Sequence, residues 1–101
     1  MGNPTIAAVA VMKPTEGNTD ALHRHLSSLA AVTLDEAGST SCAVVKVDAA
    51  EPYFVIVESF VDQAAYDAHE ASPQVLEIAG AIGEVLAEAT IHAGSVSSGR
   101  F

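Results

Sequence analysis

The chain has 101 residues, the size of one domain, so we expect residues 1–101 to form a single domain with a core over about residues 5–96 and a frayed tail at 97–101. Half of the residues are hydrophobic, which excludes a disordered chain. Thirteen acidic residues against four Lys and Arg give a formal net charge of −9, and the bases are scattered. We therefore expect no nucleic-acid or membrane partner.

Cysteine usage and hydropathy bear on the cellular compartment. Cys42 is the only cysteine, so the chain cannot form an internal disulfide, and its Cys and His residues lack the spacing of a metal site. The segment Met1–Ala10 lacks the basic region of a signal peptide, and no apolar run reaches the roughly 18 residues of a membrane span. These features predict a cytoplasmic protein without a bound metal.

The first third of the chain predicts a strand followed by a helix. The short apolar run Ile6–Met12 ends before Lys-Pro and is typical of a buried strand. The segment Thr19–Ala37 carries apolar residues at three- and four-residue steps on one helical face, beginning with Leu22, Leu26 and Leu29. Asn18 or Thr19 is expected to cap this helix, and Gly38 to end it in the left-handed conformation.

The rest of the chain predicts three further strands and a pair of helices. The strands are rich in β-branched and aromatic residues and cover Ser41–Val47, Tyr53–Phe60 and Thr90–Val96. The first two of these form a hairpin. Asp62 is expected to cap a short helix, and Ser72 with Pro73 to open a second one whose apolar period continues to Leu86.

This order of elements predicts an α+β fold. Two βαβ-type units joined by a hairpin form a ferredoxin-like split βαβ, a four-stranded antiparallel sheet with the helices on one face. The first three strands carry apolar residues at consecutive positions, so both faces of the sheet need cover, but the helices can cover only one. We therefore expect a homodimer in which two such sheets pack into a dimeric α/β barrel.

Residues 58–73, ESFVDQAAYDAHEASP, combine a strand acid, an aromatic residue two positions later, a helix-capping Asp, an Ala-aromatic pair, Ala-His and Ser-Pro. In this pattern, and in the order of elements over Ile6–Val96, the chain resembles the antibiotic biosynthesis monooxygenase family of small dimeric α+β barrels. The resemblance implies cofactor-free oxidation of quinol-like or polyketide aromatic substrates by molecular oxygen. The chain departs from the family at two positions, where Phe60 replaces a common Trp and Cys42 replaces a common aromatic residue.

Two side chains are the candidates for catalysis. His69 can remove a phenolic or enolic proton, because imidazole titrates near neutral pH. The alternative is a structural role, in which His69 binds backbone where the helix breaks before Ser72. Glu58 would act as a second base or orient His69 if the strand buries it. Its structural alternative is an ion pair with Lys46 or Arg24.

Five further side chains are candidate substrate contacts, namely Tyr66, Phe60, Phe54, His25 and Cys42. Tyr66 precedes His69 by three residues on a predicted helix, so both can face one cavity. The two phenylalanines share the strand face of Glu58, and the histidine borders the apolar stripe of the first helix. Packing in the core or in the dimer is the alternative for the aromatic rings, and burial as a small hydrophobe is the alternative for the cysteine.

These observations lead to three functional hypotheses. The first is a cofactor-independent monooxygenase, in which His69 deprotonates a quinol-like substrate and the anion reacts with oxygen in a dry pocket. The second is an isomerase or cyclase that moves protons on an enolisable substrate. The third is a barrel that binds an apolar ligand without catalysis. Oxygen consumption during turnover separates the first two, and ligand binding without turnover indicates the third.

Overall fold

The computed structural model of the chain describes residues 3–101. Its elements are, in chain order, β1 (Ile6–Pro14), α1 (Thr19–Leu34), β2 (Ser39–Val47), β3 (Tyr53–Phe60), α2 (Gln63–Ala71), α3 (Pro73–Glu84) and β4 (Leu86–Ser95). Within the described residues, no helix has both the length and the apolar character needed to cross a bilayer.

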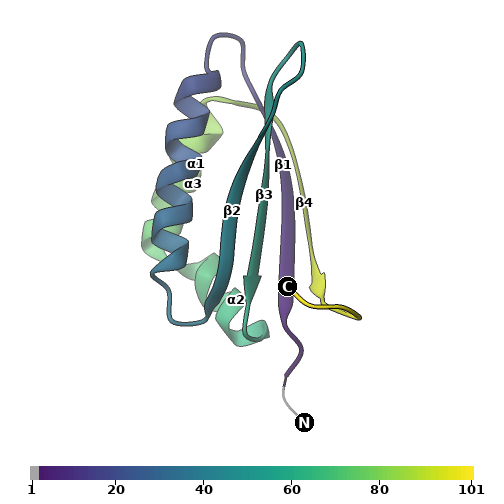
Figure 1. Cartoon of the computed structure of the whole chain (residues 1–101). Helices are drawn as coiled ribbons and strands as arrows, with labels where there is room; N and C mark the ends of the chain where they lie inside the picture. Colours follow the sequence, from purple (N-terminus) through teal and green to yellow (C-terminus); the bar gives the residue numbers. More distant parts are fainter. Residues whose placement is uncertain (1–2) are drawn as a thin grey trace.

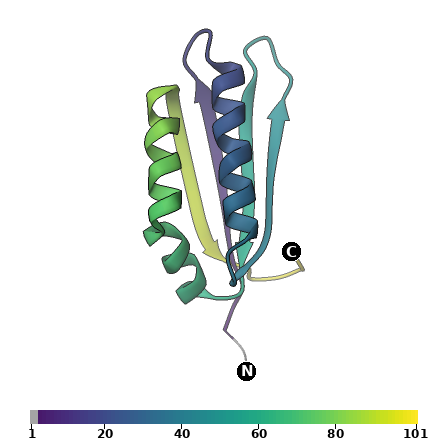
Figure 2. The ribbon, with the colours of Figure 1, turned by 90° about the vertical axis from the view of Figure 1, so that its left-hand side faces the viewer.

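The strands form one antiparallel sheet in the order β2-β3-β1-β4. All helices lie on the same face of this sheet (Figure 1), and the view from the helix side shows α1 and α3 next to each other in front of it (Figure 2). The predicted α+β ferredoxin-like fold is therefore confirmed.

The alternation of side chains along the strands determines which residues face the helices. Every second residue of β1 from Ile6 to Met12 is buried beneath the helices. In β3 the same face carries Phe54, Ile56 and Phe60, which are also buried. Glu58 has the same parity and pairs with Ala8 of β1, so the strand places one carboxylate on the helix-covered face.

The core lies between α1, α3 and the middle of the sheet. Leu22 and Leu26, from the apolar stripe of α1, have no exposed surface and pack against Phe54 and Ile82. Burial of a leucine side chain contributes about 1.5–3 kcal/mol to stability. This packing holds α1 against the sheet, and several of the same core residues also line the candidate site described below.

The first helix ends earlier than the sequence predicts, and Gly38 has a different role. α1 ends at Leu34, with Asp35 as its C-cap, so the predicted extension to Ala37 is wrong. The predicted left-handed stop at Gly38 is also wrong, because its φ is not positive. A Cβ on Gly38 would overlap the Cβ of Ala65 in α2, so glycine is needed there for a close approach between the chain and this helix.

The break between α2 and α3 has the predicted capping chemistry. The Asp62 side chain accepts a hydrogen bond from the backbone N–H of Ala65 at 2.8 Å and caps α2. The Ser72 hydroxyl accepts one from the backbone N–H of Val75 at 3.5 Å, and Pro73 is the first residue of α3. The turn between the helices fixes the position of the last turn of α2.

Two other predicted boundaries need correction. Asn18 occupies the N-cap position of α1, but its side chain donates to the Thr15 hydroxyl at 2.8 Å and does not cap the helix. The last strand begins at Leu86, not at Thr90, because Leu86 already pairs with Pro14 of β1. The helical period that extends to Leu86 therefore crosses from a helix into a strand.

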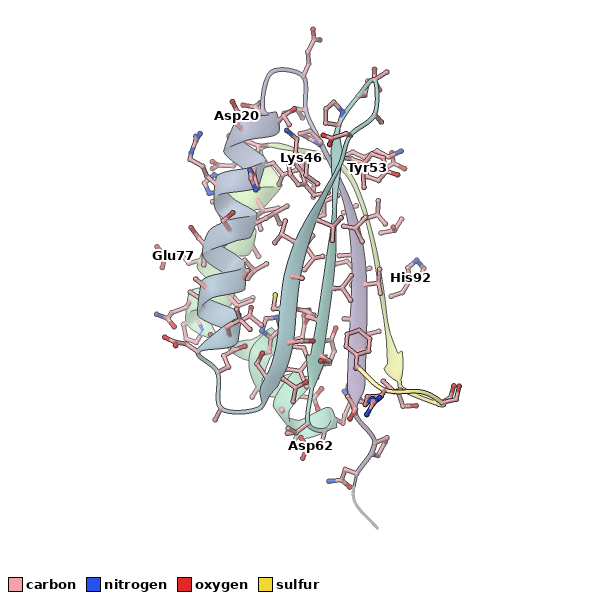
Figure 3. All side chains as sticks on the ribbon, viewed as in Figure 1. Asp20, Lys46, Tyr53, Asp62, Glu77 and His92 are labelled. Carbon is pink, nitrogen blue, oxygen red and sulfur yellow. The ribbon has the colours of Figure 1, made fainter. Side chains whose placement is uncertain are left out.

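The helices leave the second face of the sheet open, although Ser59, at one end of this face, is fully buried. Val9 and Val45 lie on this face with exposed fractions of 37% and 47%. His92 pairs with Val9, and its side chain points away from the helices (Figure 3). This largely open apolar face is what the predicted homodimer requires, and the homodimer itself stays a prediction.

Candidate functional site

A cavity of about 260 Å³ lies between the helices and the sheet. Its lining is mostly apolar and comes from all three helices and from β1, β3 and β4, with Ala8, Ala10, Met12, Leu29, Ile56, Glu58, His69, Glu70, Val75, Ala79, Ile82, Gly83, Leu86, Ala89 and Ile91. The polar residues among them are two glutamates and one histidine, which gather where α2 meets β3. The cavity is therefore apolar with one polar end.

His69 is the central group of the polar end. It lies in the last turn of α2, and only 4% of its side chain is exposed. Its Nδ1 lies 2.7 Å from Oε1 of Glu36, and its Nε2 lies 3.8 Å from Oε2 of Glu58. The first distance is a hydrogen bond and the second is too long for one. The imidazole thus binds a carboxylate, and not the backbone that the structural alternative required.

Glu58 reaches the same end of the cavity from β3. Its side chain is 12% exposed and lies near His69, and it forms no ion pair with Lys46 or Arg24. Burial raises the pKa of this carboxyl above its ordinary value, the nearby His69 opposes the rise, and the negative charges of Glu70 and Glu36 add to it. Glu58 therefore holds a proton more tightly than an exposed glutamate does.

Glu36 is a member of the site that sequence reasoning missed. It lies in the connection between α1 and β2, whose backbone is held by hydrogen bonds from Glu36 to the Thr33 carbonyl and from Ser39 to the Glu36 carbonyl, both 3.1 Å long. The close approach of Gly38 to α2 brings this connection against the helix that carries His69. Sequence reasoning placed Glu36 inside the predicted helix over Thr19–Ala37 and therefore did not consider it as a site residue. The one feature of the sequence that could have pointed to Glu36 is its position two residues before Gly38.

Phe60 and Tyr66 surround the imidazole but do not line the cavity. The Phe60 ring lies 4.9 Å from the His69 ring and 5.4 Å from the Tyr66 ring, and Tyr66 stacks on His69 at 6.4 Å. Burial, followed by the negative charge of Glu70, raises the pKa of Tyr66 to about 12. The phenol thus stays protonated at neutral pH, and both rings restrict the orientation of the histidine.

The other three candidate contacts do not line the cavity. Phe54 is fully buried in the core and stacks on His23 at 5.3 Å. His25 is half-buried on α1 and is not a lining residue. Cys42 packs against the core with its Sγ 4.0 Å from Oε2 of Glu58, where burial and this carboxylate raise the pKa of the thiol to about 11. The thiol therefore lies beside Glu58.

Comparison with known proteins identifies the family. The model of the antibiotic biosynthesis monooxygenase family matches residues 5–81. The chain belongs to this family. No curated protein sequence is significantly similar to it.

Solved structures of other proteins share the fold of this family member. A protein from Shewanella oneidensis is 31% identical, with 91% of this chain and 90% of that chain covered and a TM-score of 0.82. A protein from Mycobacterium tuberculosis is 23% identical, with 94% and 97% covered and a TM-score of 0.85. A mutant of SnoaB from Streptomyces nogalater, described as a cofactor-independent oxygenase, is 12% identical, with 95% and 96% covered and a TM-score of 0.84.

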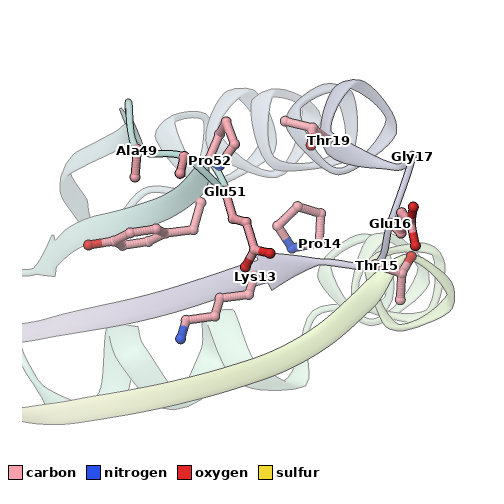
Figure 4. A pocket seen from close by; sticks show the side chains of 11 residues that line it. Lys13, Pro14, Thr15, Glu16, Gly17, Thr19, Ala49, Glu51 and Pro52 are labelled. Atoms are coloured by element: carbon pink, nitrogen blue, oxygen red, sulfur yellow. The ribbon is translucent and has the colours of Figure 1, made fainter.

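A second hollow in this family member lies at the opposite end of the sheet. It measures about 840 Å³ and lies between the β1–α1 connection and the β2–β3 hairpin loop (Figure 4). Lys13, Glu51 and Tyr53 are among its lining residues, and Lys13 forms an ion pair with Glu88 at 3.3 Å. None of the candidate site residues lines it.

The geometry of the polar end limits its chemistry. Within residues 3–101, no three His, Cys, Asp or Glu side chains are arranged to hold a metal ion. Glu36 binds one imidazole nitrogen from outside the cavity, while the other nitrogen lies toward Glu58, which lines it. Such an arrangement can accept a proton from a ligand hydroxyl and stabilise the resulting imidazolium between two carboxylates.

Proposed function

We propose that the protein is a cofactor-independent monooxygenase that oxidises a quinol-like aromatic substrate with molecular oxygen, with His69 as the base. The observation that carries the proposal is the buried imidazole at the polar end of an apolar cavity, with Nδ1 bonded to Glu36. Family membership supports an oxygenase, and the description of the fold neighbour SnoaB as cofactor-independent supports the absence of a cofactor.

The first step is proton transfer from the substrate. A ligand hydroxyl at the polar end lies within reach of Nε2 of His69 and Oε2 of Glu58, which are 3.8 Å apart. Because Glu36 accepts the Nδ1 proton, Nε2 has its lone pair free to take the hydroxyl proton. The imidazolium then lies between the two glutamates, and the substrate remains as an electron-rich anion.

The second step is the reaction with oxygen. The quinolate transfers electrons to O₂, one oxygen atom bonds to a ring carbon, and the other leaves as water. The quinol gives up four electrons in total and becomes a hydroxyquinone, and O₂ takes up the same four. The apolar walls formed by Ala8, Ala10 and Ile56 exclude water that would otherwise solvate the anion.

The assembly in this proposal is a homodimer. Val9, Val45 and their neighbours form an apolar sheet face that the helices leave open, and a second copy of the sheet supplies a complementary surface. Analytical ultracentrifugation at micromolar concentration is expected to show a dimer for the native chain and a monomer for Val9→Glu. A native chain that sediments as a monomer would contradict this assembly.

An isomerase or cyclase is the second candidate function, and the pairing of Glu58 with His69 favours it. Burial raises the pKa of Glu58, so this carboxyl can donate a proton while the imidazole accepts one. Moving a proton between two carbons needs both an acid and a base in one site.

Oxygen uptake tests the proposed function against this alternative. Protein stripped of flavin and metal is mixed with a neutral quinol, and dissolved oxygen is followed with an electrode. The oxygenase consumes one O₂ for each hydroxyquinone formed, and an isomerase forms product without oxygen uptake. Binding of the quinol without any product would leave only a binding function.

A further inference from the structure

The cavity contains acidic groups but no lysine or arginine. Its polar residues are His69, Glu58 and Glu70, and the other lining residues are apolar. The chain has four Lys and Arg in total, namely Lys13, Arg24, Lys46 and Arg100, and none of them lines the cavity. A carboxylate or phosphate on a ligand would find no lysine or arginine there and would lie beside two glutamates.

The mouth of the cavity lies between the helix pair and the edge strand β4. The lining residues that are exposed come from these elements, with Glu70 at the end of α2, Ala79 and Gly83 in α3, and Ala89 and Ile91 in β4. The remaining lining residues are buried or half-buried. A ligand that enters from this side passes Glu70 and meets Glu58 and His69 at the same polar end.

We propose that the cavity selects a neutral aromatic alcohol of one or two fused rings and excludes carboxylated and phosphorylated ligands, with Glu58 and Glu70 as the residues that reject negative charge. This inference rests on the proposed function for the aromatic alcohol, but the charge selection holds with or without turnover. The cavity volume of about 260 Å³ is below the range of roughly 300–1,000 Å³ that suits larger ligands. This small volume limits the ligand to one or two fused rings. Like charges in a pocket of low dielectric repel strongly, so the two glutamates disfavour a negatively charged ligand.

A matched ligand pair separates charge from size. A hydroxynaphthamide and the hydroxynaphthoate with the same substitution pattern have nearly the same shape and differ by one negative charge. Their binding is measured at pH 7 by naphthol fluorescence under anaerobic conditions, so that turnover plays no part. The chain has no Trp, so this fluorescence carries no tryptophan background. The amide is expected to bind at least about tenfold more tightly than the acid.

Reversing the charge at the mouth tests the role of Glu70. Glu70→Lys is expected to raise the affinity for the naphthoate at least about tenfold and to leave the affinity for the amide nearly unchanged. Glu77→Lys makes the same charge change on an exposed position of α3 outside the cavity and is expected to alter neither affinity. If the lysine variant at residue 70 does not fold, Glu70→Gln serves in its place, with a smaller gain for the acid.

Each outcome of this experiment decides the proposal. Tight amide binding with weak acid binding, reversed by Glu70→Lys alone, supports it even if no quinol is ever oxidised. Equal binding of the two ligands overturns the charge selection. Failure of both ligands to bind overturns the assignment of an aromatic alcohol, and an equal gain from Glu77→Lys shows that net charge, not the cavity, decides affinity.

Discussion

The hydrogen bond between Glu36 and His69 provides the sharpest test of the site, through the substitution Glu36→Gln. The glutamine keeps the size of the side chain and removes its charge from a partner 2.7 Å away. Two unit charges about 4 Å apart attract by about 4 kcal/mol at an effective dielectric constant of 20. Glu36 is 23% exposed, which reduces the effect toward the 1.5–3 kcal/mol that is typical of hydrogen bonds to charged groups. Because Glu36 stabilises the imidazolium that the proposed step forms, kcat is expected to fall about 10- to 100-fold.

The assay for Glu36→Gln has a kinetic and a spectroscopic part. KM should change little, because Glu36 does not line the cavity. Nitrogen NMR of the imidazole should show a protonated Nδ1 in the native protein and a weaker preference for that tautomer in Glu36→Gln. Asp35→Asn is the matched control, since it removes an exposed charge from the adjacent position. An unchanged kcat, or an equal loss in the control, would refute the positioning role of Glu36.

Three further predictions follow from packing and ionisation. Gly38→Ala should lower the free energy of unfolding in urea by about 1–3 kcal/mol, because its Cβ overlaps Ala65, whereas Gly80→Ala in an open helical position should raise it by about 1 kcal/mol. Cys42, whose pKa rises from 9.0 to about 11, should react with iodoacetamide about a hundredfold more slowly than a free cysteine at pH 8, and equal rates would contradict its burial. Burial raises the pKa of Glu58 in the folded protein above 4.5, its ordinary value. As the pH rises above 4.5, ionisation therefore favours the unfolded chain, and the free energy of unfolding falls. Glu58→Gln should therefore stabilise the fold at neutral pH and lose this advantage below pH 4.5, and an equal gain at both pH values would contradict the sign.

Local patterns in the sequence predicted most of the fold. The alternation in β1 and β3 and the leucine steps in α1 reflect interactions between near neighbours in the chain, so their period shows which face is buried. The Asp62 and Ser72 caps are equally local. The end of α1 was predicted wrongly because contact with Ala65, a residue distant in sequence, determines the role of Gly38.

The candidate site was predicted only where the residues lie on regular elements. His69 and Glu58 could be placed from the period of a helix and a strand, and both line the cavity. Glu36 could not, because it lies in an irregular connection 33 residues from its partner, and no spacing rule relates the two. Phe54 lies on the predicted face of β3 and His25 on α1, but neither lines the cavity. The sequence does not show how far along the sheet a cavity extends.

The role of His69 as the base is tested most directly by deleting its side chain and supplying imidazole in solution. His69→Ala is expected to lower kcat for quinol oxidation, measured by oxygen uptake, by about 10²- to 10⁴-fold. Quinol binding should persist, and added imidazole should restore part of the lost rate. An alanine variant that consumes oxygen at the native rate would contradict the assignment of His69 as the proton acceptor.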